Sequence, residues 1–118
     1  MSSPDSTDDG PFTIAEVAEA IAAERYQWQA HAVRRALQRG LSDEDVHEAI
    51  GKGSIIESYP DDEPLPSALV LGYNGTVPVH IVVAYDARER MVFIVTVYVP
   101  DREHFEADHR TRRCKADE

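Results

Sequence analysis

Cysteine is almost absent from this sequence of 118 residues, in which Cys114 is the only one. An internal disulfide and a zinc site built from several cysteines are therefore excluded. Long apolar runs are also lacking: the longest, residues 91–97, is interrupted by Thr96 and is far shorter than the roughly 20 residues that span a bilayer. Residues 1–11 contain no base and no apolar stretch, unlike a secretory signal. We expect a cytoplasmic protein without a membrane segment.

Positive charge is scarce as well: the sequence has 12 lysines and arginines against 22 aspartates and glutamates, and its net charge is −10. Such acidity argues against general binding to nucleic acids or anionic membranes. The bases are unevenly placed, however. Residues 25–40 carry four arginines and no acid, between acidic segments at 1–24 and 41–64. One local anion site therefore remains compatible with an acidic body, although a charged run can also be only a solvated face.

The length fits one domain, and an apolar fraction of 42% suffices for one core. We expect a disordered acidic segment at 1–11, a single α+β domain at 12–113 and a flexible tail at 114–118. Thr13 and Glu16 form a capping box that predicts a helix over about 14–24. A second helix should cover about 30–39 and end at Gly40, and Ser42 should cap a third that ends at Gly51 and Gly53. Residues 25–28 fit either a short extended link or a continued first helix.

Helical spacing divides the second predicted helix into two faces. At 100° per residue, one face gathers the basic side chains, and the opposite face is apolar. The basic face consists of His31, Arg34, Arg35 and Arg39, and the apolar face consists of Ala32, Val33, Ala36 and Leu37.

Four strands are predicted at residues 54–59, 67–73, 77–85 and 91–99, and they form a four-stranded antiparallel meander on which the helices pack. The sequence around Asn74-Gly75 predicts a type I′ turn between the second and third. Pairing Tyr85 with Met91 would place His80 opposite Thr96 and close to Tyr98. That register predicts one apolar face toward the helices, made of Val79, Ile81, Val83, Phe93, Val95 and Val97.

Several short motifs occur in a characteristic combination. They read HAxxR at 31–35, RGLS at 39–42, GxIIExYP at 53–60, PSxLVLG at 66–72, PVHIVV at 78–83 and IxTxYxPD at 94–101. Over about residues 14–113 the sequence resembles an uncharacterised bacterial domain family grouped with RelE/ParE/BrnT-like toxin domains. The resemblance implies helices packed on a curved antiparallel sheet. Many proteins of that wider group cut RNA, others do not, and they tend to be basic, unlike this chain. Phe105 stands where related sequences often have tryptophan.

Metal-independent RNA cleavage requires a base, an acid and a cation for the phosphate, and needs no metal or cofactor. His31 and His80 are the candidates for proton transfer, with Tyr98 as acid or orienting group. The candidates for phosphate binding are Arg34, Arg35, Arg39, Arg112 and Arg113. Each has a structural alternative: His31 as a surface or capping residue, His80 as a core histidine, and Tyr98 as a packing aromatic. Arg35 and Arg39 could instead pair with Asp43, Glu44 or the acidic N-terminal segment.

Two functions follow from these residues. The first is a RelE/ParE-like toxin-type domain that cleaves or binds RNA and pairs with an antitoxin-like protein. The second is a non-catalytic interaction domain whose basic helix face docks an acidic partner protein or the chain's own acidic N-terminus. The sequence predicts no particular oligomeric state.

Overall fold

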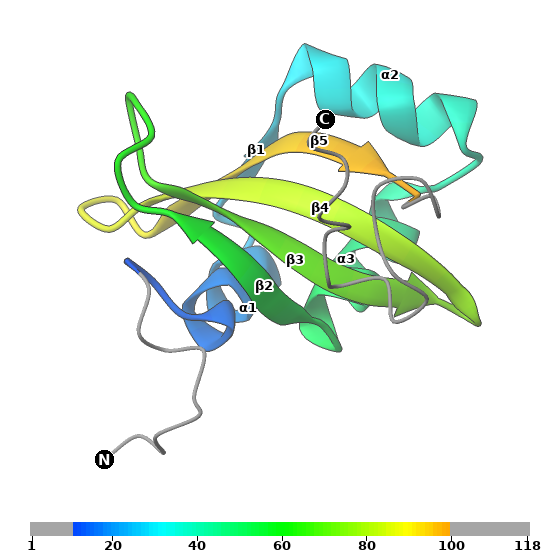
Figure 1. Ribbon diagram of the computed structural model, residues 1–118, viewed down its shortest axis with the longest axis horizontal. Helices are drawn as coiled ribbons and strands as arrows, with labels where there is room; N and C mark the ends of the chain where they lie inside the picture. Colours follow the sequence, from blue (N-terminus) through cyan, green and yellow to red (C-terminus); the bar gives the residue numbers. More distant parts are fainter. Residues whose placement is uncertain (1–10, 100–118) are drawn as a thin grey trace, which may run out of the picture.

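The computed structural model describes residues 11–99, which form three helices and five strands (Figure 1). The predicted segment 1–11 lies outside this range apart from Pro11, as do Arg112, Arg113 and the tail 114–118. None of the helices in the described range combines the length and the apolar character needed to cross a bilayer. In chain order the elements are α1 (Ile14–Ala22), β1 (Tyr26–Trp28), α2 (Ala30–Gln38), α3 (Asp43–Gly51), β2 (Ser54–Tyr59), β3 (Ser67–Asn74), β4 (Val77–Asp86) and β5 (Met91–Tyr98).

Local capping determines where two of the helices begin. Thr13 and Glu16 form the predicted capping box of α1, and Ser42 forms another with Asp45 at the start of α3. The first helix ends at Ala22, two residues earlier than predicted, and the backbone of Glu24 takes a positive φ of 64°. The chain then becomes extended. Of the two predictions for residues 25–28, the short extended link is therefore confirmed and the continued helix is wrong.

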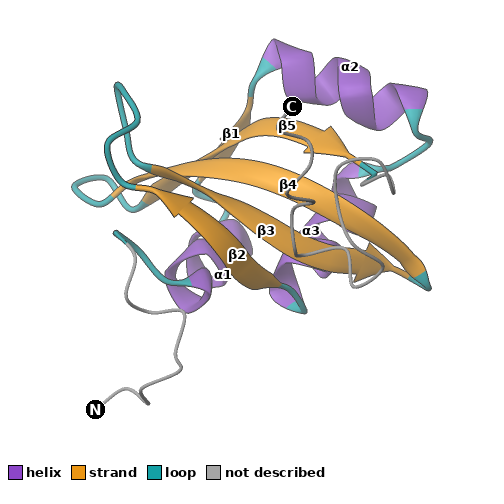
Figure 2. Cartoon of the chain, in the orientation of Figure 1, coloured by secondary structure: helices purple, strands orange, loops and turns teal. Residues whose placement is uncertain are grey.

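The sheet has five strands in the order β1-β5-β4-β3-β2 (Figure 2). The prediction of a four-stranded antiparallel sheet is therefore corrected. β1 adds a fifth strand and makes the sheet mixed, because it pairs in parallel with β5, Tyr26 opposite Val92 and Trp28 opposite Ile94. The other neighbouring strands are antiparallel. Three residues are too few to show the alternating pattern by which a strand is predicted from sequence.

The register between β4 and β5 differs from the prediction by one residue near the turn and by two residues beyond a bulge in β5. Tyr85 pairs with Val92 instead of Met91, and His80 pairs with Tyr98 instead of Thr96. The pairing skips Val95, which marks a bulge in β5. Between the turn and the bulge, the one-residue change moves the side chains of β5 to the other face. Phe93 and Val95 are consequently absent from the core, although both were predicted there.

The turn between β3 and β4 also differs in type. Asn74 pairs with Val77, so Gly75 and Thr76 form the two-residue connection. Of these two residues, only Gly75 has a positive φ, of 65°. That pattern corresponds to a type II′ turn, whereas a type I′ turn was predicted.

One face of the sheet packs on α1 and α3, which lie behind it in Figure 1. Helix α3 approaches β3 very closely at Gly72, where an added Cβ would lie 2.1 Å from the carbonyl oxygen of Ala49. The shared core is largely aliphatic and includes Val17, Val46, Ile50, Val70, Val79, Ile81, Val83, Val92, Ile94 and Val97. Helix α2 lies elsewhere, beside β5 at the top of the view, where only Ala32 and Ala36 of the helix are buried.

Candidate functional site

The basic face of α2, consisting of His31, Arg34, Arg35 and Arg39, is exposed over all four side chains. The spacing predicted this face correctly. Among residues 11–99 the only ion pairs are His47 with Asp43 and Lys52 with Glu48. The arginines of α2 therefore do not pair with the acids in the first turn of α3, which was one structural alternative for them. No acid within residues 11–99 pairs with them, and the other alternative, pairing with the acidic N-terminal segment, falls outside the described range.

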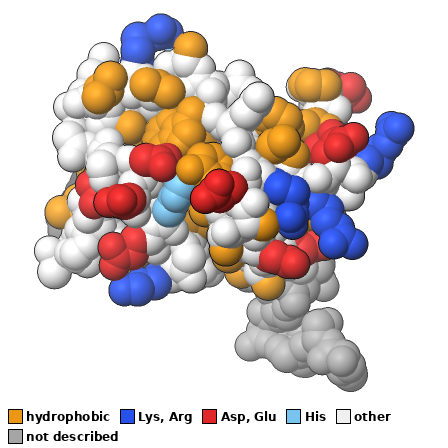
Figure 3. Space-filling model, turned by 180° about the vertical axis from the view of Figure 1, so that it is seen from behind, with side chains coloured by type: hydrophobic (Ala, Val, Ile, Leu, Met, Phe, Trp, Pro, Cys, Tyr) orange, Lys and Arg blue, Asp and Glu red, His pale blue; other side chains and the backbone are white. Residues whose placement is uncertain are grey.

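Exposed apolar side chains lie beside this basic face. Val33 is 41% exposed and Leu37 is 72% exposed, although both belong to the predicted apolar face of the helix. A shallow groove of about 370 Å³ runs along them, with Trp28, Ala36 and Leu41 among its other lining residues. Figure 3 shows basic and apolar side chains close together at the top of the molecule, where Figure 1 places α2. We call Val33, Leu37 and this lining the α2 groove.

A polar cluster that the sequence did not predict lies at one end of the α2 groove. The Nε1 of Trp28 donates a hydrogen bond of 2.7 Å to Oδ1 of Asp43, and the hydroxyl of Tyr26 donates one of 3.2 Å to Oδ2. The Nε2 of His47 lies 3.1 Å from Oδ1 of Asp43 and the His47 ring stands edge-on to Tyr26, with centroids 4.5 Å apart. Burial, followed by the charge of Asp43, raises the pKa of Tyr26 above 10.0.

This cluster joins β1 to the first turn of α3, on both sides of α2 in the sequence. Its signal in the sequence is weak: two aromatic residues spaced two apart, and an acid and a histidine four apart on a helix. The Asp43 carboxylate accepts two hydrogen bonds that connect β1 to α3 beside the groove.

His80 and Tyr98, two of the three predicted catalytic residues, lie together in the sheet. Their rings are 5.2 Å apart and edge-on, and Nδ1 of His80 is 3.3 Å from the Tyr98 hydroxyl. His80 has no exposed surface, whereas His31 is exposed on α2. The structure thus brings His80 to Tyr98, but the two histidines do not share an accessible surface. This burial agrees with the alternative interpretation, in which His80 is a structural histidine of the protein interior.

No group of three or more histidine, cysteine, aspartate or glutamate side chains between residues 11 and 99 has the arrangement of a metal site. Arg112 and Arg113, the two phosphate-binding candidates near the C-terminus, lie outside the described range, and their predicted role stays a prediction.

The comparisons with known proteins agree in part with the resemblance seen in the sequence. The family model described as "Domain of unknown function (DUF4258)" matches residues 28–99, from Trp28 through α2 and α3 to the end of β5. No curated protein and no solved structure matches the chain significantly. The matched segment contains the basic face, the α2 groove and the His80–Tyr98 pair, and it makes up more than half of the sequence. The chain therefore belongs to the DUF4258 family of domains of unknown function.

Proposed function

We propose that this protein is a binding module that docks an acidic segment of a partner protein on α2. The observation that carries the proposal is the exposed set of arginines on one helix face, none of which has an acidic partner within residues 11–99. On a chain with a net charge of −10, such a face is a local positive site in a negative surface. A ligand with a short anionic stretch is attracted to it, whereas a longer polyanion is repelled by the surroundings.

The α2 groove favours a protein partner over RNA. Val33 and Leu37 expose apolar surface next to Arg34, and Leu41 and Trp28 line the groove behind them. An amphipathic helix supplies both kinds of group at matching spacing, with apolar side chains for the groove and carboxylates for the arginines. RNA supplies anionic phosphates, but its bases stack mainly on aromatic side chains, whereas the exposed apolar residues of α2, Val33 and Leu37, are aliphatic. Arginine also suits carboxylates because its planar guanidinium can donate two parallel hydrogen bonds.

The alternative is the toxin-type function, in which the protein cleaves RNA. His31 would then act as the base on α2, and His80 with Tyr98 would supply the acid. The contact between His80 and Tyr98 supports this alternative, since two of the required groups are adjacent. The complete burial of His80 counts against it, because a proton donor must reach the leaving oxygen. Cleavage would require a rearrangement that exposes His80.

A binding experiment with two fluorescent probes separates these functions. One probe is a short amphipathic helical peptide of leucine and glutamate, and the other is a single-stranded RNA of equal charge. Fluorescence anisotropy should detect the peptide and give weaker or no binding for the RNA. Arg34→Glu should weaken peptide binding about threefold to tenfold, as expected for the loss of a partly exposed ion pair.

Arg88→Glu is the matched control, because Arg88 is exposed in the β4–β5 turn and its replacement changes the net charge equally. Equal weakening by both variants would mean that only total charge matters and would refute docking on α2. Tighter binding of the RNA, with cleavage that His31→Ala and His80→Ala abolish, would establish the toxin-type alternative instead.

A further inference from the structure

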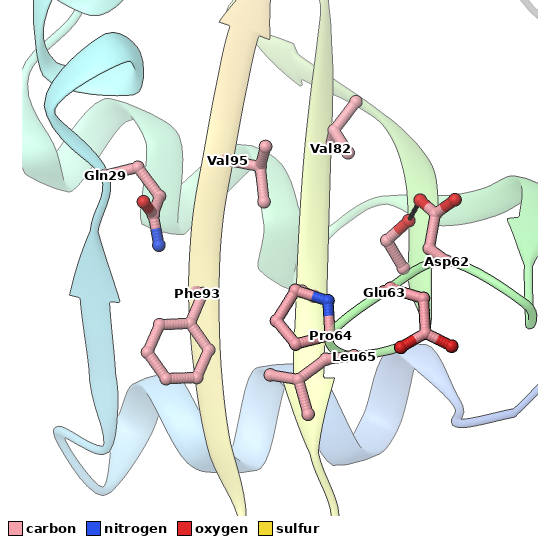
Figure 4. Close-up of a pocket in the computed structure, with 10 residues that line it drawn as sticks. Gln29, Asp62, Glu63, Pro64, Leu65, Val82, Phe93 and Val95 are labelled. Atoms are coloured by element: carbon pink, nitrogen blue, oxygen red, sulfur yellow. Dashed lines mark hydrogen bonds between the residues drawn. The ribbon is translucent and has the colours of Figure 1, made fainter.

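The sheet has a second face that α1 and α3 do not cover. Val82, Phe93 and Val95 of β4 and β5 point to this side and are only half-buried. A cavity of about 350 Å³ lies over them (Figure 4). Sites for small molecules usually enclose roughly 300–1,000 Å³, so this cavity is large enough for a compact ligand.

Hydrogen bonds hold both walls of the cavity in place. On one side, the backbone N–H of Gln29 donates to the carbonyl oxygen of Ile94 at 2.9 Å. On the other side, the loop of residues 60–66 is fixed at its end, where the N–H of Tyr85 donates to the carbonyl oxygen of Pro66 at 3.2 Å. The Ser67 hydroxyl also donates to the Asp62 carboxylate. A preformed cavity of this kind loses little conformational freedom when a ligand enters.

The charged residues that line the cavity are all negative. Asp62 and Glu63 line it, and its remaining lining residues are uncharged, with Gln29 on the opposite side (Figure 4). Neither acid takes part in an ion pair within the described part of the chain. Both residues are exposed and line the cavity, so two carboxylates border it, and no cation among residues 11–99 pairs with them. The cavity therefore combines an apolar floor with a negative rim.

We propose that this cavity binds an organic cation, an ammonium or guanidinium group carried on a compact apolar body. The cation would lie at Asp62 and Glu63, where charge-assisted hydrogen bonds to carboxylates are strong. The apolar body would pack on Phe93 and Val95, whose half-exposed surface would leave water. A carboxylate ligand of the same shape is repelled by the rim. This site shares no charged residue with the basic face of α2, so it does not depend on the function proposed there.

Titration of the intact protein with phenethylamine, followed by the amide signals in two-dimensional NMR spectra, tests the proposal. Phenethylamine should shift signals of residues that line the cavity, and phenylacetate, which has the same ring and the opposite charge, should not. Glu63→Gln and Asp62→Asn should each weaken binding of the amine about threefold to tenfold, because each removes one partly exposed charge. Asparagine at position 62 keeps an oxygen that can accept from Ser67.

Asp61→Asn is the matched control, since Asp61 lies in the same loop but does not line the cavity. The amine should bind this variant, and also Arg34→Glu, as it binds the wild type. Equal binding of phenylacetate, shifts confined to residues outside the cavity, or equal losses in Asp61→Asn and Glu63→Gln would overturn the proposal. A short peptide of phenylalanine and lysine with blocked ends identifies the source of the cation. Tighter binding of the peptide points to a protein side chain, and tighter binding of phenethylamine points to a free amine.

Discussion

The indole Nε1 of Trp28 donates a hydrogen bond of 2.7 Å to Oδ1 of Asp43, and this bond joins β1 to the first turn of α3. Trp28 precedes α2 in the sequence and Asp43 follows it. The bond therefore connects the two ends of the segment that carries the basic face. Only Ala32 and Ala36 of α2 are buried, and two alanines supply little apolar contact. The position of α2 therefore depends strongly on the connections at its two ends.

Asp43→Ala should lower the free energy of unfolding by about 1–2 kcal/mol. It removes the acceptor of Trp28 and of Tyr26, and it removes a negative charge from the first turn of α3, where the helix dipole favours one. Urea denaturation measures the change. Glu44→Ala is the control, because Glu44 is an exposed acid in the same turn. An equal loss in both variants would show that only the helix dipole matters and that the two hydrogen bonds add nothing.

The Tyr26 phenol should titrate above its ordinary value. Burial raises the pKa of Tyr26, and the Asp43 carboxylate raises it further by charge and by its hydrogen bond. The folded protein then holds this proton to higher pH than the unfolded chain. The resulting stability is present below the ordinary pKa of 10.0 and is lost as the pH rises through the folded pKa. Asp43→Asn should lower the midpoint for Tyr26, measured by NMR of its ring carbons, without restoring it fully because burial remains. An unchanged midpoint would contradict a contribution from Asp43.

Local signals explain which parts of the fold were predictable. Thr13 with Glu16 and Ser42 with Asp45 satisfy backbone groups a few residues away, so the helix starts follow from sequence alone. The basic face of α2 follows from helical spacing for the same reason. β1 has no such signal, since its three residues form a strand only because β5 lies beside them.

Long-range contacts explain the errors. The β4–β5 register depends on which residue meets Tyr85 and on a bulge at Val95, and neither is encoded in the alternation of apolar residues. Spacing placed Val33 and Leu37 on an apolar face, but no helix or strand within residues 11–99 buries these two side chains. The cluster around Asp43 likewise links residues 15 and 17 positions apart through the fold.

Gly72→Ala should destabilise the protein severely. An added Cβ would lie 2.1 Å from the carbonyl oxygen and 2.6 Å from the carbonyl carbon of Ala49, so α3 would have to move away from β3. We expect a loss of about 3 kcal/mol or more in the free energy of unfolding, since the clash is with backbone and not with a flexible side chain. Gly51→Ala is the control, because no atom outside its own surroundings lies within 4 Å of the new Cβ. Its stability should change by less than about 1 kcal/mol. Similar losses in both variants would refute the close approach of α3 and β3.

Leu37→Ser should leave the stability nearly unchanged and should weaken binding of the acidic helical peptide. Leu37 is 72% exposed, and exposed positions without special contacts usually change the free energy of unfolding by less than about 0.5 kcal/mol. Urea denaturation and fluorescence anisotropy measure the two quantities on the same sample. Val77→Ser is the control, because Val77 is 45% exposed at the β3–β4 turn and should affect neither. A clear loss of stability in Leu37→Ser would mean that Leu37 is already covered in solution, and the α2 groove would then not be free to receive a partner.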